Sequence, residues 1–188
     1  MMDNKTLKIR QAKVGDIPAI LVLLANAVRK LSDGYYSREQ IEAIVRSQST
    51  YLVDSFRIGS ELIFIGEIEQ QPVATACLTV GVFPVAWSRQ LRISGAYVHP
   101  DFARQGISRQ MLQEIEETAR QKNVSRLTVT SSLAAVPFYR AMGYADDRRT
   151  FFHIGRHRID CMDMSKSVAS QAQVARQFSL LESLFPLF

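Results

Sequence analysis

The residues best suited to bind a charged ligand lie between positions 96 and 112. An apolar run at 96–98 indicates the end of a strand, and Pro100 stops it because proline cannot donate to a strand ladder. A basic turn at 104–106 then leads into a helix that begins near Ile107. The first N–H groups of a helix have no partner within the helix, and the positive end of its dipole lies behind them. The sequence therefore predicts a phosphate or pyrophosphate site at this turn.

Two other sets of polar residues have types and spacings that could bind a ligand, one a metal ion and the other an acidic acceptor. His153, His157 and Cys161 recur at intervals of four, which on a helix would place metal ligands on one face. We expect a hairpin here, which divides these residues between two strands, and we therefore predict no metal. The same region holds a basic cluster, which either attracts an acidic acceptor or is the solvated surface of the hairpin. Its members are Arg148, Arg149, Arg156 and Arg158.

The composition bounds the class of protein. The chain has 188 residues, 47% of them apolar, which is enough for one well-filled core. Its formal charge is +5, but the basic residues are scattered without a stripe, which argues against nucleic-acid binding. The start of the chain lacks a secretory signal pattern, and the longest apolar stretch, 19–24, is too short to span a membrane. Cys77 and Cys161 are expected to be reduced core residues, so we expect a soluble cytoplasmic protein.

Hydrophobic periodicity and chain breakers predict an α/β fold. Helices are expected at 17–31 behind a cap at Asp16, after a capping box at 37–40, after the anion turn, and from about Ala135. The element order β-α-α-β-β-β-α-β-α-β-β predicts a mixed sheet with helices on its faces. The expected strands are 7–10, 62–68, 73–80, 91–98, 126–130, 149–154 and 158–164, with turns at 69–72 and around Gly155.

The sequence divides into a main domain at 1–167 and a tail at 168–188. The tail is predicted to form an amphipathic helix, because its apolar residues recur at spacings of four, three and four. That apolar stripe packs either on its own domain or on a second copy of the chain, which would make a homodimer. The stripe comprises Val174, Phe178, Leu181 and Phe185.

A separate apolar loop at 82–90, containing Trp87, either covers the core or forms a wall of an acceptor pocket.

Two motifs, YVHPDFARQGISRQML at 97–112 and SSLAAVPFYRAMGY at 131–144, follow each other in the order and at the separation found in one family. Through them the chain resembles the GNAT N-acetyltransferase superfamily over about residues 7–166. The resemblance implies a mostly antiparallel central sheet flanked by helices, and acetyl-CoA as the co-substrate. It also implies a set of cofactor-binding residues. These are Tyr97, Val98, Arg104, Gln105, Gly106, Ile107, Ser108, Arg109 and Phe138.

Three positions depart from the family's pattern. Ala103 lacks the usual Arg or Gln side chain, Ser108 replaces a smaller residue, and Ala134 stands where many relatives carry Asn. Backbone donors do not depend on side-chain identity, so we expect the anion site to persist. A Ser108 hydroxyl would add a donor, and Arg104 and Arg109 keep positive charge nearby.

Acetyl transfer to an amine needs a neutral nucleophile, a stabilised oxyanion and a proton for the departing thiolate. The resemblance places Tyr139 beside the cofactor sulfur as the general acid, and makes the Val98 N–H the oxyanion donor. An amine like that of lysine must first lose its proton, to a carboxylate or through water. Glu67 and Glu69 stand near the end of a strand and are candidates, but solvated carboxylates at a strand end are the better explanation of them, so no base is assigned.

These features together predict an acetyl-CoA-dependent N-acetyltransferase whose acceptor amine is a small molecule. One alternative is a protein that binds acyl-CoA without catalysis, as a sensor or interaction module. Another is an interaction protein whose tail builds an oligomer. Neither a membrane nor a nucleic-acid partner is expected.

Overall fold

The computed structural model describes residues 6–59, 61–79 and 90–168. The described strands form one seven-stranded sheet in the order β1-β2-β3-β4-β5-β7-β6. Every neighbouring pair is antiparallel except β4 and β5, which are parallel. The predicted mixed, mostly antiparallel sheet is therefore confirmed. The strands are β1 (Lys8–Gln11), β2 (Glu61–Ile68), β3 (Gln71–Thr79), β4 (Gln90–Val98), β5 (Arg126–Ser132), β6 (Ala145–Ile154) and β7 (His157–Ser167).

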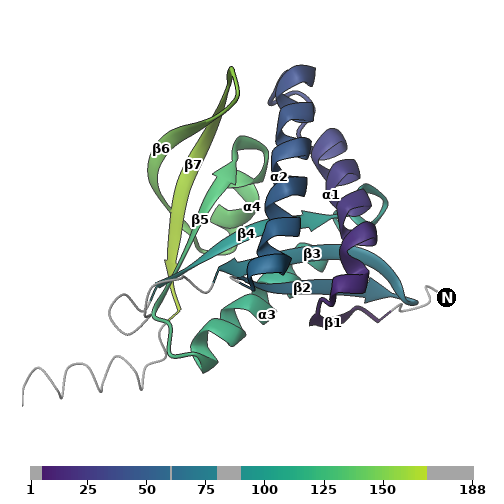
Figure 1. The fold of residues 1–188 in the computed structure, drawn as a ribbon. Coiled ribbons are helices and arrows are strands. Elements are labelled where there is room, and N and C mark those ends of the chain that lie inside the picture. The colour runs from purple at the N-terminus through teal and green to yellow at the C-terminus, as the bar shows by residue number, and fades with distance from the viewer. Residues whose placement is uncertain (1–5, 60, 80–89, 169–188) are drawn as a thin grey trace, which may run out of the picture.

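Helices cover both faces of the sheet. The first two, α1 (Ile17–Leu31) and α2 (Arg38–Ile58), lie side by side on one face (Figure 1). The helices α3 (Ile107–Gln121) and α4 (Val136–Ala141) pack into a separate buried cluster on the other face. No helix in the described ranges is long and apolar enough to cross a bilayer.

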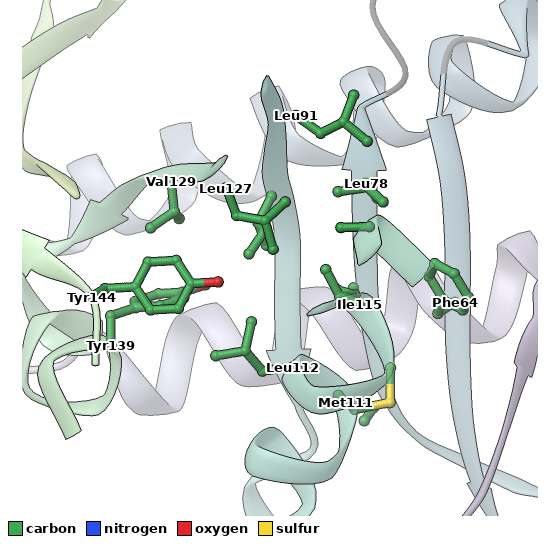
Figure 2. Close-up of a cluster of buried hydrophobic side chains, with 14 of the residues drawn as sticks. Phe64, Leu78, Leu91, Met111, Leu112, Ile115, Leu127, Val129, Tyr139 and Tyr144 are labelled. Carbon is green, nitrogen blue, oxygen red and sulfur yellow. The ribbon is translucent and has the colours of Figure 1, made fainter. Parts of the chain in front are cut away.

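The core on the α3 face follows directly from the spacing of its apolar residues. Figure 2 shows Met111, Leu112 and Ile115 facing side chains of the sheet, among them Leu78 and Leu127. Ile115 and Leu127 are completely buried. Truncating such a side chain to alanine typically costs about 2–5 kcal/mol. This packing fixes the position of the α3 N-terminus, which is where the predicted anion turn lies.

Ser37 and Asp16 both occupy the N-cap positions predicted for them, but only Ser37 caps its helix through its side chain. Ser37 accepts a hydrogen bond from the Gln40 N–H, and the Gln40 side chain accepts one from the Ser37 N–H at 2.7 Å, as in a capping box. The Asp16 side chain makes no cap bond to α1. It accepts instead from the Lys13 N–H at 2.7 Å and from Arg10 at 2.8 and 3.0 Å. A guanidinium and a nearer backbone donor therefore compete successfully for this carboxylate.

Two hairpins differ from the predicted ones in their bounds. The turn between β2 and β3 contains only Glu69 and Gln70, both with positive φ, as in a type I′ turn. Pro72 lies within β3, opposite Glu67 at a register shift where the ladder is already irregular. The final hairpin is longer than predicted, since β6 begins at Ala145 and β7 continues to Ser167. The predicted tail helix and the loop containing Trp87 lie outside the described residues.

Candidate active site

The two parallel strands of the sheet separate part of the way along their length. β4 and β5 pair only over residues 90–93 and 126–129. Beyond that point β4 stays with β3, and β5 continues along β7 (Figure 1). The β3–β4 register places one extra residue in β4 between Ser94 and Tyr97, which marks a β-bulge. Bulges bend a strand, so this one directs the end of β4 away from β5.

A cavity of about 740 Å³ includes residues from both sides of this opening. Its lining combines the end of β4, the turn and first residues of α3, the start of α4, and the end of α1. The α3 and α1 residues come from helices on opposite faces of the sheet. The cavity therefore connects the anion turn on one face with the α1 end on the other.

The turn before α3 has a backbone conformation that suits an anion. Arg104 and Gly106 both have positive φ, 65° and 79°. Gly106 occupies the N-cap position, where it has no side chain to cap the helix. The N–H groups of Ile107, Ser108 and Arg109 thus have neither a partner within the helix nor a side-chain cap. With the helix dipole behind them, these groups suit a phosphate.

The Val98 N–H also faces the opening between the strands. His99 N–H donates to the Val73 carbonyl at 2.8 Å, on the β3 side of β4. Successive N–H groups of a strand point to opposite edges, so the N–H of Val98 is directed away from β3, toward β5. Val98 lines the cavity at the level where β5 has already diverged. A backbone donor therefore points into the space between the strands.

The cavity brings together all but one of the residues predicted to bind the cofactor. The exception is Gln105, whose side-chain amide donates to the Asp101 carbonyl at 3.3 Å and which is absent from the described lining. Two of the departures from the family pattern, Ala103 and Ala134, also line the cavity. The predicted residues in the lining are Tyr97, Val98, Arg104, Gly106, Ile107, Ser108, Arg109 and Phe138.

Tyr139 lies on α4 in the wall of the same cavity. Its ring makes edge contacts with Phe138 and Tyr144, with centroids 5.2 and 5.4 Å apart. Figure 2 shows the Tyr139 and Tyr144 rings next to each other. Tyr139 is only 4% exposed, and burial raises its pKa. The phenol therefore keeps its proton at neutral pH. Such a group can donate a proton to a basic leaving group and is poorly suited to accept one.

The α1 side of the cavity was missed in reading the sequence. Ala27, Leu31, Ser32 and Tyr35 line it there. Leu31 and Tyr35 are 43% and 52% exposed, so these side chains are accessible to a ligand in the cavity. In the sequence this side of the cavity is marked only by two apolar residues, one at the end of an amphipathic helix and one just after it. Periodicity alone assigns such residues to the core.

A buried carboxylate on the α1 and α2 side of the sheet was also missed. Glu61 is 8% exposed, and its Oε1 accepts hydrogen bonds from the hydroxyls of Tyr51, Thr79 and Ser94 at 2.5, 2.6 and 2.9 Å. Its Oε2 is buried and has no hydrogen-bond partner among the described residues. Ser94 is the first β4 residue beyond the β4–β5 pairing. Glu61 itself is absent from the described cavity lining.

The carboxylates considered as bases and the residues considered as metal ligands are absent from the described lining of this cavity. Glu67 forms an ion pair with Arg10 at 2.5 Å and, like Glu69, is absent from the described lining of the cavity. His153 is on β6, whereas His157 and Cys161 are on β7. Within the described part of the chain, no three His, Cys, Asp or Glu side chains are grouped as metal ligands would be.

Comparison with known proteins places this chain in a family. The family model for the acetyltransferase (GNAT) domain matches residues 36–168. The chain therefore belongs to the GNAT acetyltransferase family. It is also similar to the uncharacterized N-acetyltransferase YafP of Escherichia coli (strain K12). The two are 21% identical over 155 residues, which is 82% of this chain and 87% of that protein.

Solved structures share the same fold. A GCN5-related N-acetyltransferase from Rhodopseudomonas palustris matches with a TM-score of 0.74 and 22% identity, over 89% of this chain and 99% of that one. The PaiA N-acetyltransferase from Thermoplasma acidophilum, solved in complex with coenzyme A, has a TM-score of 0.65 and 15% identity. That match covers 86% of this chain and 99% of the other. At these identities the likeness shows the fold alone.

Proposed function

We propose that this protein transfers the acetyl group of acetyl-CoA to the amine of a small acceptor molecule. One observation carries the proposal: a single cavity contains the anion turn, the Val98 N–H and Tyr139. These supply what the reaction needs, a binding site for the cofactor phosphates, a donor for the thioester oxygen and an acid for the thiolate. The family to which the chain belongs supports acetyl transfer as the reaction.

In this proposal the first turn of α3 binds the pyrophosphate of acetyl-CoA. The N–H groups of Ile107, Ser108 and Arg109 donate to it, and the guanidinium groups of Arg104 and Arg109 add positive charge. The pantetheine arm extends along the end of β4, past Tyr97. Coenzyme A in the complex of the similar PaiA enzyme supports this choice of ligand. The small side chains of Ala103 and Ala134 leave room in the wall.

The chemical step is a direct attack of the neutral amine on the thioester carbonyl. A bond forms between the amine nitrogen and the carbonyl carbon, and the bond between that carbon and sulfur breaks. The Val98 N–H donates to the oxygen as negative charge develops there. Tyr139 then gives its phenolic proton to the departing thiolate as the carbon–sulfur bond breaks. The amine gives up one proton to a base or to water.

The proposal is tested first by thermal unfolding with acetyl-CoA, CoA or NADH. Ligand at 100 times its dissociation constant stabilises a protein by about 2.7 kcal/mol. For a chain of this size we expect the midpoint to rise by roughly 5–10 °C with acetyl-CoA and CoA, but not with NADH. No rise at saturating ligand would contradict the cofactor assignment.

Release of CoA is then measured with a panel of primary amines. Amine-dependent release supports catalysis. Binding of acetyl-CoA without release for any amine would favour the alternative of a non-catalytic acyl-CoA-binding protein.

A further inference from the structure

A second cavity, of about 590 Å³, lies between α4 and the β6–β7 hairpin. Figure 1 shows this hairpin extending beside α4 at one end of the sheet. The second cavity shares two wall residues, Tyr35 and Pro137, with the first. Tyr35 lies between α1 and α2, at the α1 end of the first cavity. The two cavities are therefore adjacent at the end that lies opposite the anion turn.

The wall of the second cavity carries an excess of positive charge. Three guanidinium groups and one carboxylate are among its described lining residues. Arg158 forms an ion pair with Asp160 at 2.8 Å and stacks over the Phe151 ring at 4.1 Å. Arg140 pairs with Asp146, which is absent from the described lining. Arg149 makes no hydrogen bond or ion pair with any other described side chain.

The hairpin separates the basic cluster seen in the sequence. Arg149 stands opposite Met162 in the β6–β7 ladder and lines the cavity. Its neighbour Arg148 stands opposite Asp163 and pairs with that carboxylate at 2.9 Å. Adjacent side chains of a strand point to opposite faces, so these two arginines lie on different sides of the hairpin. Only Arg149 of this adjacent pair is available to the cavity.

We propose that the second cavity binds an anionic group, a carboxylate or phosphate, carried by the acceptor whose amine is acetylated in the first cavity. This inference rests on the proposed function and narrows its acceptor to amines that bear an anionic group. Guanidinium groups bind carboxylate and phosphate through paired N–H donors. Arg149, which has no ionic partner among the described residues, beside two partly compensated guanidinium groups suits a single such anion. Because Tyr35 lines both cavities, an anionic group bound in the second cavity lies next to the α1 side of the first.

The same chemistry is also present in the 3′-phosphate of CoA. The position favours the acceptor, because the turn proposed to bind the cofactor phosphates lines the first cavity only, at the α3 end. The junction between the cavities lies instead at Tyr35 and Pro137. An experiment must separate these two sources of the anion.

The test compares matched amines that differ only in the anionic group. CoA release is followed with β-alanine against propylamine, with longer ω-amino acids against their alkylamines, and with phosphoethanolamine against ethanolamine. Wild-type protein is compared with Arg149→Gln and with the control Arg148→Gln. Both positions are exposed, so the fold should tolerate either change.

We expect Arg149→Gln to lower kcat/KM for the anionic amine of a pair about tenfold and to leave its neutral partner unchanged. Arg148→Gln should change neither by more than about twofold. The preference for anionic amines should also weaken as salt is raised. Equal losses in both variants, or loss for the neutral amine as well, would overturn the proposal.

A second arm measures binding of CoA and dephospho-CoA by titration calorimetry. If Arg149→Gln weakens binding of CoA but not of dephospho-CoA, the cavity serves the 3′-phosphate and the acceptor assignment is wrong. Unchanged affinity for both ligands is the expected result. If wild-type protein binds acetyl-CoA but acetylates no amine, the proposed function itself fails. If the protein instead acetylates neutral amines and Arg149→Gln has no effect, the proposed function stands and only the assignment of the second cavity fails.

Discussion

The two ends of the first cavity differ in what builds them. At the α3 end, donors come from the backbone, at a turn where Arg104 and Gly106 have left-handed conformations. At the α4 end, the chemically useful group is a side chain, the buried phenol of Tyr139. A backbone site tolerates changes of side chain as long as its conformation holds, whereas a side-chain site does not. The small side chain of Ala103 in the wall therefore leaves unchanged the backbone N–H groups that we propose bind the anion.

The largest effect is expected at the side-chain end. Tyr139→Phe removes one hydroxyl and keeps the ring that packs against Phe138 and Tyr144. Because general acids typically contribute 10²–10⁴ in rate, we expect kcat to fall about 100-fold or more, with acetyl-CoA affinity within about twofold of wild type. Steady-state kinetics and ligand titration measure the two effects. Unchanged turnover would remove Tyr139 from the mechanism.

Tyr144→Phe is the matched control for this variant. Tyr144 packs against the Tyr139 ring, is absent from the described lining of the cavity, and its buried hydroxyl has no hydrogen-bond partner among the described residues. Its loss should leave turnover unchanged.

The pH profile gives a further check. Burial raises the pKa of Tyr139 above its ordinary value of about 10. The acid should thus stay protonated, and kcat should not fall on the alkaline side below about pH 10.

The backbone end is tested by Gly106→Ala. Gly106 has a φ of 79°, and a Cβ there would meet no atom within 4 Å, so the change brings conformational strain and no steric clash. A left-handed conformation costs an alanine about 1–2 kcal/mol. We expect roughly tenfold weaker acetyl-CoA binding as the turn shifts its N–H groups, and a lower free energy of unfolding.

Gly155→Ala is the control, since Gly155 has a φ of 56° and open space around its Cβ position, but lies in the β6–β7 turn. It should lose similar stability and bind acetyl-CoA as wild type does. Equal affinity in both variants would contradict the backbone account.

The turn that leads into α3 could be predicted because its signals are local. A strand end, a proline, a glycine and a helical periodicity lie within 17 consecutive positions, 96–112. The role of Tyr139 came from resemblance, and the structure places it in the cavity wall. Glu61 was missed because its hydroxyl partners come from α2, β3 and β4, and only the sheet pairing brings them together. Asp16 occupies the predicted N-cap position of α1, but its carboxylate does not cap the helix, because Arg10 and the Lys13 N–H bind it.

Glu67 and Glu61, both on β2, are expected to differ in how much they contribute to stability. Glu67 is paired with Arg10, so Glu67→Gln should lower the free energy of unfolding by about 1 kcal/mol. Glu61 has no cation within its hydroxyl cluster, and its Oε2 has no partner among the described residues. A glutamine keeps the acceptor for the hydroxyls and removes the buried charge, so Glu61→Gln should leave stability unchanged or raise it by up to about 1 kcal/mol. Urea unfolding measures both. A large decrease in the free energy of unfolding of Glu61→Gln would mean that this carboxylate stabilises the fold.

The smallest effect is expected from the charge that surrounds the turn. Arg104 is exposed, and its side chain makes no hydrogen bond or ion pair with other described residues, so Arg104→Gln removes only a solvated charge from the cavity mouth. Exposed charge pairs contribute about 0.2–1 kcal/mol and are screened by salt. We expect acetyl-CoA affinity to fall about two- to threefold at low ionic strength and to match wild type at 0.5 M salt. A loss as large as that in Gly106→Ala, persisting in salt, would mean that the arginine side chain binds the phosphates directly. The two ends of the cavity would then both depend on side chains.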